Sequence, residues 1–92
     1  MNYDNRFNLF LKSNSEIEKN YIVNYKKNYN EKSLLEYCCD HNLCKWLNII
    51  KSYANTDLLE YYSKSEKIEF KIFKLLFIKY KKSYLQNIIL YS

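Results

Sequence analysis

Ser33-Leu34-Leu35-Glu36-Tyr37 returns 24 positions later as Asp57-Leu58-Leu59-Glu60-Tyr61, and Ser83-Tyr84-Leu85-Gln86 is a weaker third copy. Each copy is typical of a helix start. A Ser or Asp at the N-cap accepts a bond from a free backbone N–H, and a Glu or Gln three residues on bonds back to the cap. Repeated helical units of this length usually stack. We therefore expect an all-α fold, a short solenoid-like array of antiparallel helix pairs.

The repeated stretches divide the chain into four segments, which start near Asn8, Ser33, Asp57 and Ser83. Ninety-two residues are enough for one domain with a modest core, so we expect a single helical-repeat domain over residues 1–92. Within a segment the pattern predicts a short apolar helix, a polar turn and a longer amphipathic helix. The chain has no Gly and no Pro, so its turns must rely on Asn, Asp and Ser.

The second and third segments show this plan best. Residues 40–42 are the expected turn of the second segment, with Asn42 as the N-cap of the helix that follows. In the third segment a turn over residues 63–65 precedes an apolar stretch with Phe70, Phe73 and Phe77 at helical spacing. Residues 68–72 also alternate as in a strand, but residues 73–78 break the alternation and favour a helix. We expect seven apolar residues in the core: Leu35, Trp46, Leu47, Ile50, Leu59, Phe73 and Leu76.

The second and third segments resemble degenerate ankyrin repeats, and the resemblance covers about residues 33–90. The family's repeat opens Thr-Pro-Leu-His-x-Ala-Ala; here Ser33 stands at the capping Thr, Leu35 at the leucine and Cys38-Cys39 at the paired small residues. Residues 46–50 and 72–76 are similar to the apolar stretch of the family's second helix. The family's Pro, His and Gly residues are missing, and the short spacing leaves no room for its projecting hairpin. The resemblance implies a binding scaffold without catalysis.

Cys38, Cys39, His41 and Cys44 are the one cluster of metal-ligand residue types in the chain. Structural zinc is usually held by two short ligand pairs that a longer loop separates, whereas these four residues crowd into seven positions. We therefore expect no metal and no cofactor, and we expect the adjacent cysteines to fill packing positions, one of them more protected than the other. A Cys–His nucleophile pair would also need a third orienting group, and nothing in the sequence supplies one. We expect no catalytic residues and no enzyme activity.

Net charge is +5, and Arg6 is the sole arginine among the 15 Lys and Arg residues. Four lysines at helical spacing share one side of the last long helix: Lys67, Lys71, Lys74 and Lys81. With Tyr80, Tyr84 and Tyr91 nearby, this lysine face is a candidate polyanion contact for single-stranded nucleic acid. Its apolar opposite side also fits a helix that lies on a membrane surface. The simplest interpretation is a solvated face opposite a core face.

The first hypothesis for function is a non-catalytic protein–protein interaction module of degenerate ankyrin-like repeats with an unidentified protein partner. The alternative is a small basic nucleic-acid binder that uses the lysine face. Apolar residues at the end of the sequence, Ile88 to Leu90, suggest either a truncated longer array or a surface for self-association. The three cysteines suit a reducing compartment, and the sequence has neither a signal peptide nor an apolar stretch of membrane-spanning length. We expect an intracellular protein, cytoplasmic or nuclear and not secreted.

Overall fold

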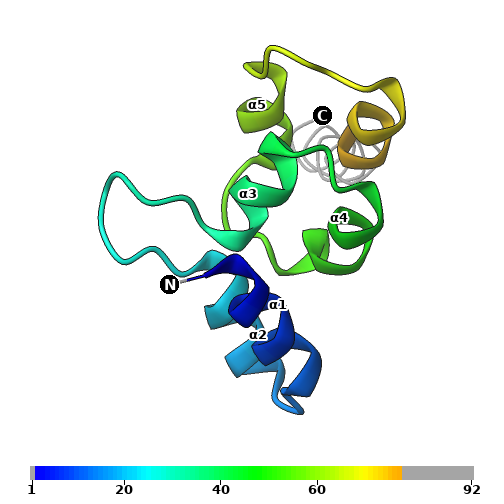
Figure 1. The fold of residues 1–92 in the computed structure, drawn as a ribbon. Helices are drawn as coiled ribbons and strands as arrows, with labels where there is room; N and C mark the ends of the chain where they lie inside the picture. Colours follow the sequence, from blue (N-terminus) through cyan, green and yellow to red (C-terminus); the bar gives the residue numbers. More distant parts are fainter. Residues whose placement is uncertain (1, 78–92) are drawn as a thin grey trace, which may run out of the picture.

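The computed structural model describes residues 2–77, and in them helices are joined by turns and loops (Figure 1). Residues 70–77 are also helical, and no residue in the range 2–77 is in a strand, which confirms the all-α class. The order of the other elements is α1 (Tyr3–Lys12), α2 (Glu16–Asn24), α3 (Leu34–Asp40), α4 (Cys44–Ile50), the 3-10 helix η1 (Lys51–Tyr53) and α5 (Leu58–Ser63).

The repeated stretches mark helix starts as predicted. Ser33 caps α3: its hydroxyl accepts from the Glu36 N–H at 3.2 Å, and its own N–H donates to Glu36 Oε1 at 3.0 Å. Asp57 caps α5, where its carboxylate accepts from the Glu60 N–H at 3.0 Å. Both caps are local, because the bonded residues lie three positions apart.

The expected start of a segment near Asn8 is wrong. Asn8 lies inside α1, which begins at Tyr3 after the N-cap Asn2, whose side chain accepts from the Asp4 N–H at 2.9 Å. Asn2 supplies an acceptor to the free N–H groups of the first turn, and Asp4 adds a negative charge that the helix dipole favours there. The expected start at Ser83 lies outside the described residues.

Asn42 is not the N-cap of the following helix. The cap position of α4 is Leu43, with no side-chain bond, and Asn42 has a φ of 54°. Asn tolerates this left-handed conformation better than most residues, and it ends a helix here in a chain without glycine. Its side chain reaches across the fold instead, donating from Nδ2 to the Lys67 carbonyl oxygen at 3.1 Å and accepting at Oδ1 from the Tyr62 hydroxyl.

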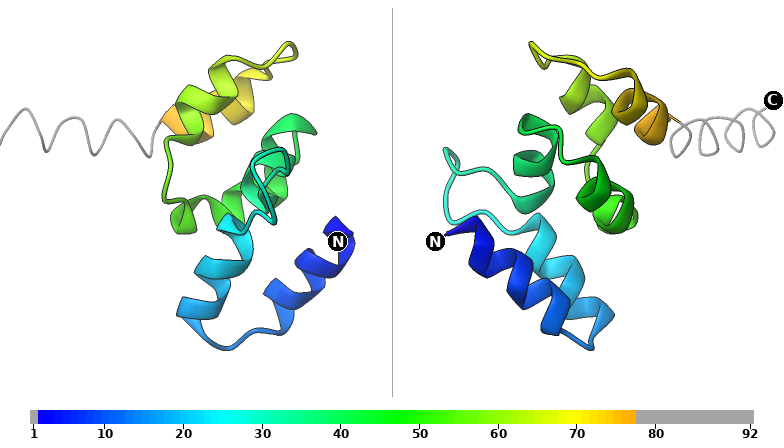
Figure 2. Two further views of the ribbon diagram at one scale, coloured as in Figure 1. Left: turned by 90° about the vertical axis from the view of Figure 1, so that its left-hand side faces the viewer. Right: turned by 45° about the vertical axis from the view of Figure 1, so that its right-hand side comes forward.

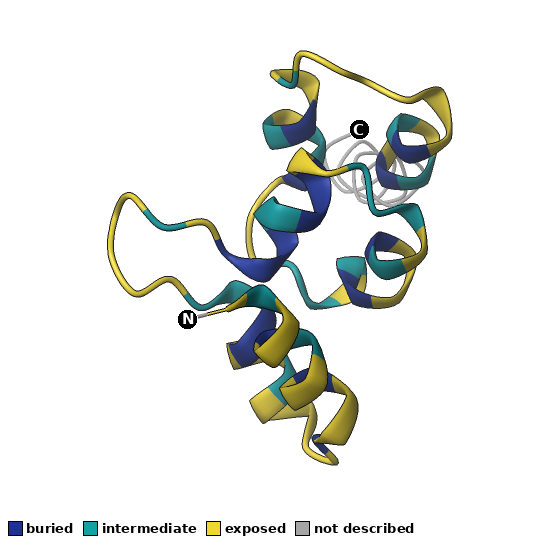
Figure 3. Ribbon diagram, viewed as in Figure 1, coloured by how far each residue is buried: buried dark blue, intermediate teal, exposed yellow. Residues whose placement is uncertain are grey.

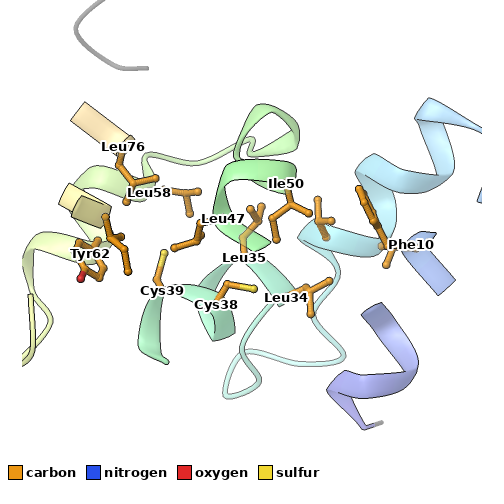
Figure 4. Packing of buried hydrophobic residues seen from close by; sticks show 13 residues of the cluster. Phe10, Leu34, Leu35, Cys38, Cys39, Leu47, Ile50, Leu58, Tyr62 and Leu76 are labelled. Atoms are coloured by element: carbon orange, nitrogen blue, oxygen red, sulfur yellow. The ribbon is translucent and has the colours of Figure 1, made fainter. Parts of the chain in front are cut away.

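The helices pack in the order of the sequence. Figures 1 and 2 show the α1–α2 hairpin at one end, α3 and α4 in the middle, and α5 with residues 70–77 at the other end. Helix α3 is central, because it contacts α1, α2, α4 and α5. One hydrophobic core runs through all three tiers (Figures 3 and 4). None of the helices in residues 2–77 has the length and apolar character that crossing a membrane requires.

Four of the seven expected core residues are fully buried: Leu35, Leu47, Ile50 and Leu76. The other three pack against the core with part of the side chain exposed: Trp46, Leu59 and Phe73. In α5 the neighbouring Leu58 takes the interior position. Because Trp46 is only half-buried, its truncation to alanine should cost less than the roughly 3–5 kcal/mol of a fully buried Trp.

Of the phenylalanine stripe of residues 70–77, only Phe73 packs against the core, and it is only partly buried. Ile72 and Leu76, one turn apart, are the buried pair, while Phe70 is 78% exposed and Phe77 is also exposed. The entry into this helix sets its rotation, because the Glu69 N–H donates to the buried Tyr62 hydroxyl at 2.8 Å.

Candidate interaction surfaces

Side chains of α1 and α2 form an uncovered apolar surface, which we call the Tyr21 surface: Leu9, Ile17, Tyr21 and Tyr25. Ile17 is 85% exposed and Tyr21 is 64% exposed, while the Tyr21 and Tyr25 rings lie 5.4 Å apart between centroids. Figure 3 shows mostly exposed residues along these two helices. Exposed apolar groups that gather in this way often mark a binding site.

Two hollows open in the Tyr21 surface and share both tyrosines. The first has a volume of about 230 Å³ and is also lined by Arg6, Leu9 and Ile22. The second has a volume of about 420 Å³ and is lined by residues of α2 and the segment after η1: Ile17, Asn20, Tyr21, Asn24, Tyr25 and Asn55. The surface therefore combines aromatic walls, apolar ends and an amide rim.

Asn24 fixes the rim of the second hollow to the rest of the fold. Its Nδ2 donates to the Tyr53 carbonyl oxygen at 2.8 Å, and its Oδ1 accepts from the Asn55 N–H at 3.3 Å. The Tyr53 hydroxyl in turn donates to Glu16 Oε2 at 2.6 Å. These bonds join the helix that carries Tyr21 to the segment around η1 and hold the hollow in shape.

Arg6 forms part of the floor of the first hollow. The side chain is buried; its guanidinium pairs with Glu31, donates from Nη1 to the Lys32 carbonyl oxygen at 3.2 Å, and lies over the Tyr3 and Tyr25 rings. Burial acts to raise the pKa of Glu31, but the hydrogen bond from the Lys27 N–H and the Arg6 charge outweigh it and lower that pKa. Arg6 thus ties the loop before α3 to α1, and it is not available for surface contacts.

The residues of the candidate metal cluster, Cys38, Cys39, His41 and Cys44, do not form a metal site in the fold. Cys38 and Cys39 are both fully buried, so the expected difference in protection between them is wrong. Helix α3 is packed against four other helices, so both of these adjacent side chains are covered by a neighbouring helix. Burial raises the pKa of both thiols to about 12. The His41 ring is exposed and lies 4.3 Å from the Tyr37 ring, while Cys44 is partly exposed. Within residues 2–77, no three His, Cys, Asp or Glu side chains lie together as a metal site would need.

Only Lys71 and Lys74 of the predicted lysine face lie in the 70–77 helix, because that helix begins after Lys67, which lies in the preceding bend. Lys67, Lys71 and Lys74 are exposed, whereas Lys81 and the three tyrosines Tyr80, Tyr84 and Tyr91 lie outside residues 2–77. The fold adds Lys45 and Trp46, which line a hollow together with Lys71. Sequence reasoning missed Lys45 because it lies on a different helix, and only the packing of that helix brings it near the lysine face.

A second feature that sequence reasoning missed is a polar pocket between α3 and α5. Lys32 Nζ donates to the Tyr61 hydroxyl at 2.7 Å, and that hydroxyl donates to Asp40 Oδ1 at 2.8 Å. The pocket has a volume of about 220 Å³ and includes Lys64 and Ser65 in its wall. Burial and the bond to Asp40 raise the pKa of Tyr61, so the phenol stays protonated and acts as a structural bridge.

No family model, curated protein or solved structure matches this chain. The described residues define an all-α protein whose helices pack in sequence order and which exposes Leu9, Leu11, Ile17 and Tyr21 on its first two helices.

Proposed function

We propose that this chain is a non-catalytic protein–protein interaction module that binds its partner through the Tyr21 surface. The observation that carries the proposal is the pair of hollows that share Tyr21 and Tyr25, with the exposed Leu9 and Ile17 beside them. Tyrosine combines a large apolar ring with a polar tip and is enriched in protein contacts. Hollows of this size accept single side chains of a partner, and the amide rim supplies hydrogen bonds around them.

The composition of the hollows supports a binding role without chemistry. Their walls contain rings, aliphatic side chains, amides and the guanidinium of Arg6, which is already paired with Glu31. Acid–base or nucleophilic catalysis needs a carboxylate, imidazole, thiol or activated hydroxyl within reach of a substrate. None of the residues that line these two hollows has a carboxylate, an imidazole or a thiol.

We further propose that residues 33–77 are two worn ankyrin-like units. The capped helices α3 and α5 pack against each other, as first helices of adjacent units do in a stack. Two pairs of positions 24 apart have the same burial: Leu34 and Leu58 are both fully buried, and so are Cys38 and Tyr62. The 70–77 helix follows α5 as α4 follows α3.

The test is a surface variant, Ile17→Ser with Tyr21→Ser, compared with wild type in affinity capture from cells that express the chain. Both residues are exposed, so the variant should keep the helical circular-dichroism signal and the melting midpoint. We expect the variant to lose a protein that the wild type retains. The purified protein should then bind the wild type directly and bind the variant at least about tenfold more weakly, as expected when central contacts are removed.

The matched control is Ile49→Ser with Tyr29→Ser, which changes the same residue types at exposed positions elsewhere. This control should bind the purified partner as the wild type does. Equal binding by the Ile17/Tyr21 variant, or equal loss in both variants, would show that the Tyr21 surface is not the binding site.

A further inference from the structure

A hollow of about 350 Å³ lies between the start of α4 and the 70–77 helix. Its wall is formed by residues from both segments: Asn42, Leu43, Cys44, Lys45, Trp46 and Lys71. The bond from Asn42 Nδ2 to the Lys67 carbonyl oxygen ties the two segments together beside the hollow. Its aromatic and cationic groups are therefore held in a fixed arrangement by the fold.

The surroundings of this hollow are strongly basic. Lys45 and Lys71 line it, and Lys67 and Lys74, which are within four residues of Lys71 in the sequence, are also exposed. Lys71 pairs with Glu69, whose Oε2 lies 3.5 Å from Lys71 Nζ, and both side chains are exposed. An exposed ion pair of this kind contributes little free energy, so a phosphate can compete for the lysine. Two lysines at the opening, with two more exposed lysines close to Lys71 in the sequence, suit a backbone of repeated negative charge.

Trp46 gives the hollow an aromatic wall. One part of its ring packs against Phe7, with 4.3 Å between centroids, and against the edge of Phe10. These contacts fix the orientation of the indole, and Trp46 is also one of the residues that line the hollow. A ring held in this way can stack with a planar base at a small entropic cost.

We propose that this hollow binds single-stranded nucleic acid, with one base against Trp46 and neighbouring phosphates on Lys45, Lys71 and Lys74. A flexible single strand can turn a base into the hollow, whereas the bases of a duplex are stacked inside it. Readout of a duplex groove commonly uses arginine, and Arg6 is buried and paired. This site is separate from the Tyr21 surface, so it does not depend on the protein-binding proposal.

The chain offers a direct test, because Trp46 is its one tryptophan. Unlabelled oligothymidylate should quench the Trp46 fluorescence in a saturable way. Anisotropy of a fluorescein-labelled oligothymidylate should give the same midpoint, and affinity should fall steeply with added salt. Lys45→Glu with Lys71→Glu should weaken binding at least about tenfold and lower the salt slope by about 1.4, for two lost phosphate contacts on a single strand. Trp46→Leu, followed by anisotropy, should weaken binding roughly 5- to 100-fold.

Two controls separate this site from general attraction to polyanions. Lys12→Glu with Lys27→Glu makes the same change in net charge on α1 and in the loop before α3, and it should keep most of the affinity. Heparin has charge without bases, so it should compete with the oligonucleotide but leave Trp46 unquenched. The proposal is overturned by any of four results: no binding, equal loss in both lysine pairs, binding that Trp46→Leu leaves unchanged, or equal quenching by heparin. Circular dichroism of each variant checks that the helices are intact.

Discussion

Replacing Tyr62 with phenylalanine would test how the last two tiers of the fold are joined. The Tyr62 ring is fully buried in the core (Figure 4). Its hydroxyl donates to Asn42 Oδ1 at 2.5 Å and accepts from the Glu69 N–H at 2.8 Å. One oxygen atom therefore connects the turn between α3 and α4 to the residue before the 70–77 helix. Tyr62→Phe removes this atom and leaves the packing of the ring unchanged.

The expected cost follows from the two hydrogen bonds. A neutral hydrogen bond contributes about 1 kcal/mol net, and partly buried groups that lose their partner add to the loss. We expect Tyr62→Phe to lower the free energy of unfolding by about 2–3 kcal/mol. For a domain of this size that corresponds to a fall in melting midpoint of roughly 10–20 °C. The amide proton of Glu69 should also exchange faster, because it loses its acceptor.

Urea unfolding followed by circular dichroism measures the difference, and Tyr61→Phe is the matched control. The Tyr61 hydroxyl also makes two hydrogen bonds, to Lys32 and Asp40, but at an exposed pocket where water can replace them. We expect Tyr61→Phe to cost less than about 1 kcal/mol. If both variants lost the same stability, or if Tyr62→Phe lost less than about 0.5 kcal/mol, the hydroxyl would not join these segments as we argue.

Three further predictions concern charged and titratable groups. Arg6→Met should destabilise the fold and make the loop before α3 sensitive to proteases, because it leaves Glu31 without its cation; equal proteolysis of wild type and variant would contradict this. Cys44 should react with a thiol reagent in the native state, whereas Cys38 and Cys39 should react only after unfolding. Rapid reaction of all three thiols in the native state would contradict this. A chelator should leave the melting midpoint unchanged. The contribution of the protonated Tyr61 phenol to the free energy of unfolding should be complete below about pH 10 and be lost as the pH rises above it, because the folded state raises the pKa of Tyr61. Urea unfolding across alkaline pH measures this, and the same pH profile for wild type and Tyr61→Phe would oppose it.

The helix starts at Ser33 and Asp57 could be predicted because the determining bonds are local. A cap and the residue three positions later are within reach of each other in any helix that begins there. The all-α class followed from the same feature together with the lack of Gly and Pro. The predicted helix start at Asn8 was wrong because it rested on the regular spacing of the segments. The local capping residues, Asn2 at the N-cap and the acidic Asp4 in the first turn, are the stronger signal for a helix start.

The rotation of the last described helix could not be predicted because distant contacts decide it. Residues 70–77 offer two apolar stripes, one with the phenylalanines and one with Ile72 and Leu76. Periodicity does not tell which stripe a neighbour covers. The choice depends on Tyr62, seven residues earlier, and on Asn42, whose side chain binds a carbonyl 25 residues away.

The candidate surfaces were hidden from sequence reasoning for a related physical reason. The repeated stretches contain the residues that cap helices and fill the core. Such residues are buried or hydrogen-bonded to near neighbours, so they do not form a binding surface. Tyr21 and Ile17 lie before the first repeated stretch, where the pattern is weakest, and they are exposed because no helix in residues 2–77 covers them. One sequence signal could have indicated the surface: an apolar residue that does not fall at helical spacing with the core residues of its helix, such as Ile17 at the start of α2. The proposed binding surface therefore lies on the segment that fits the repeated pattern least, so the pattern could not have predicted it.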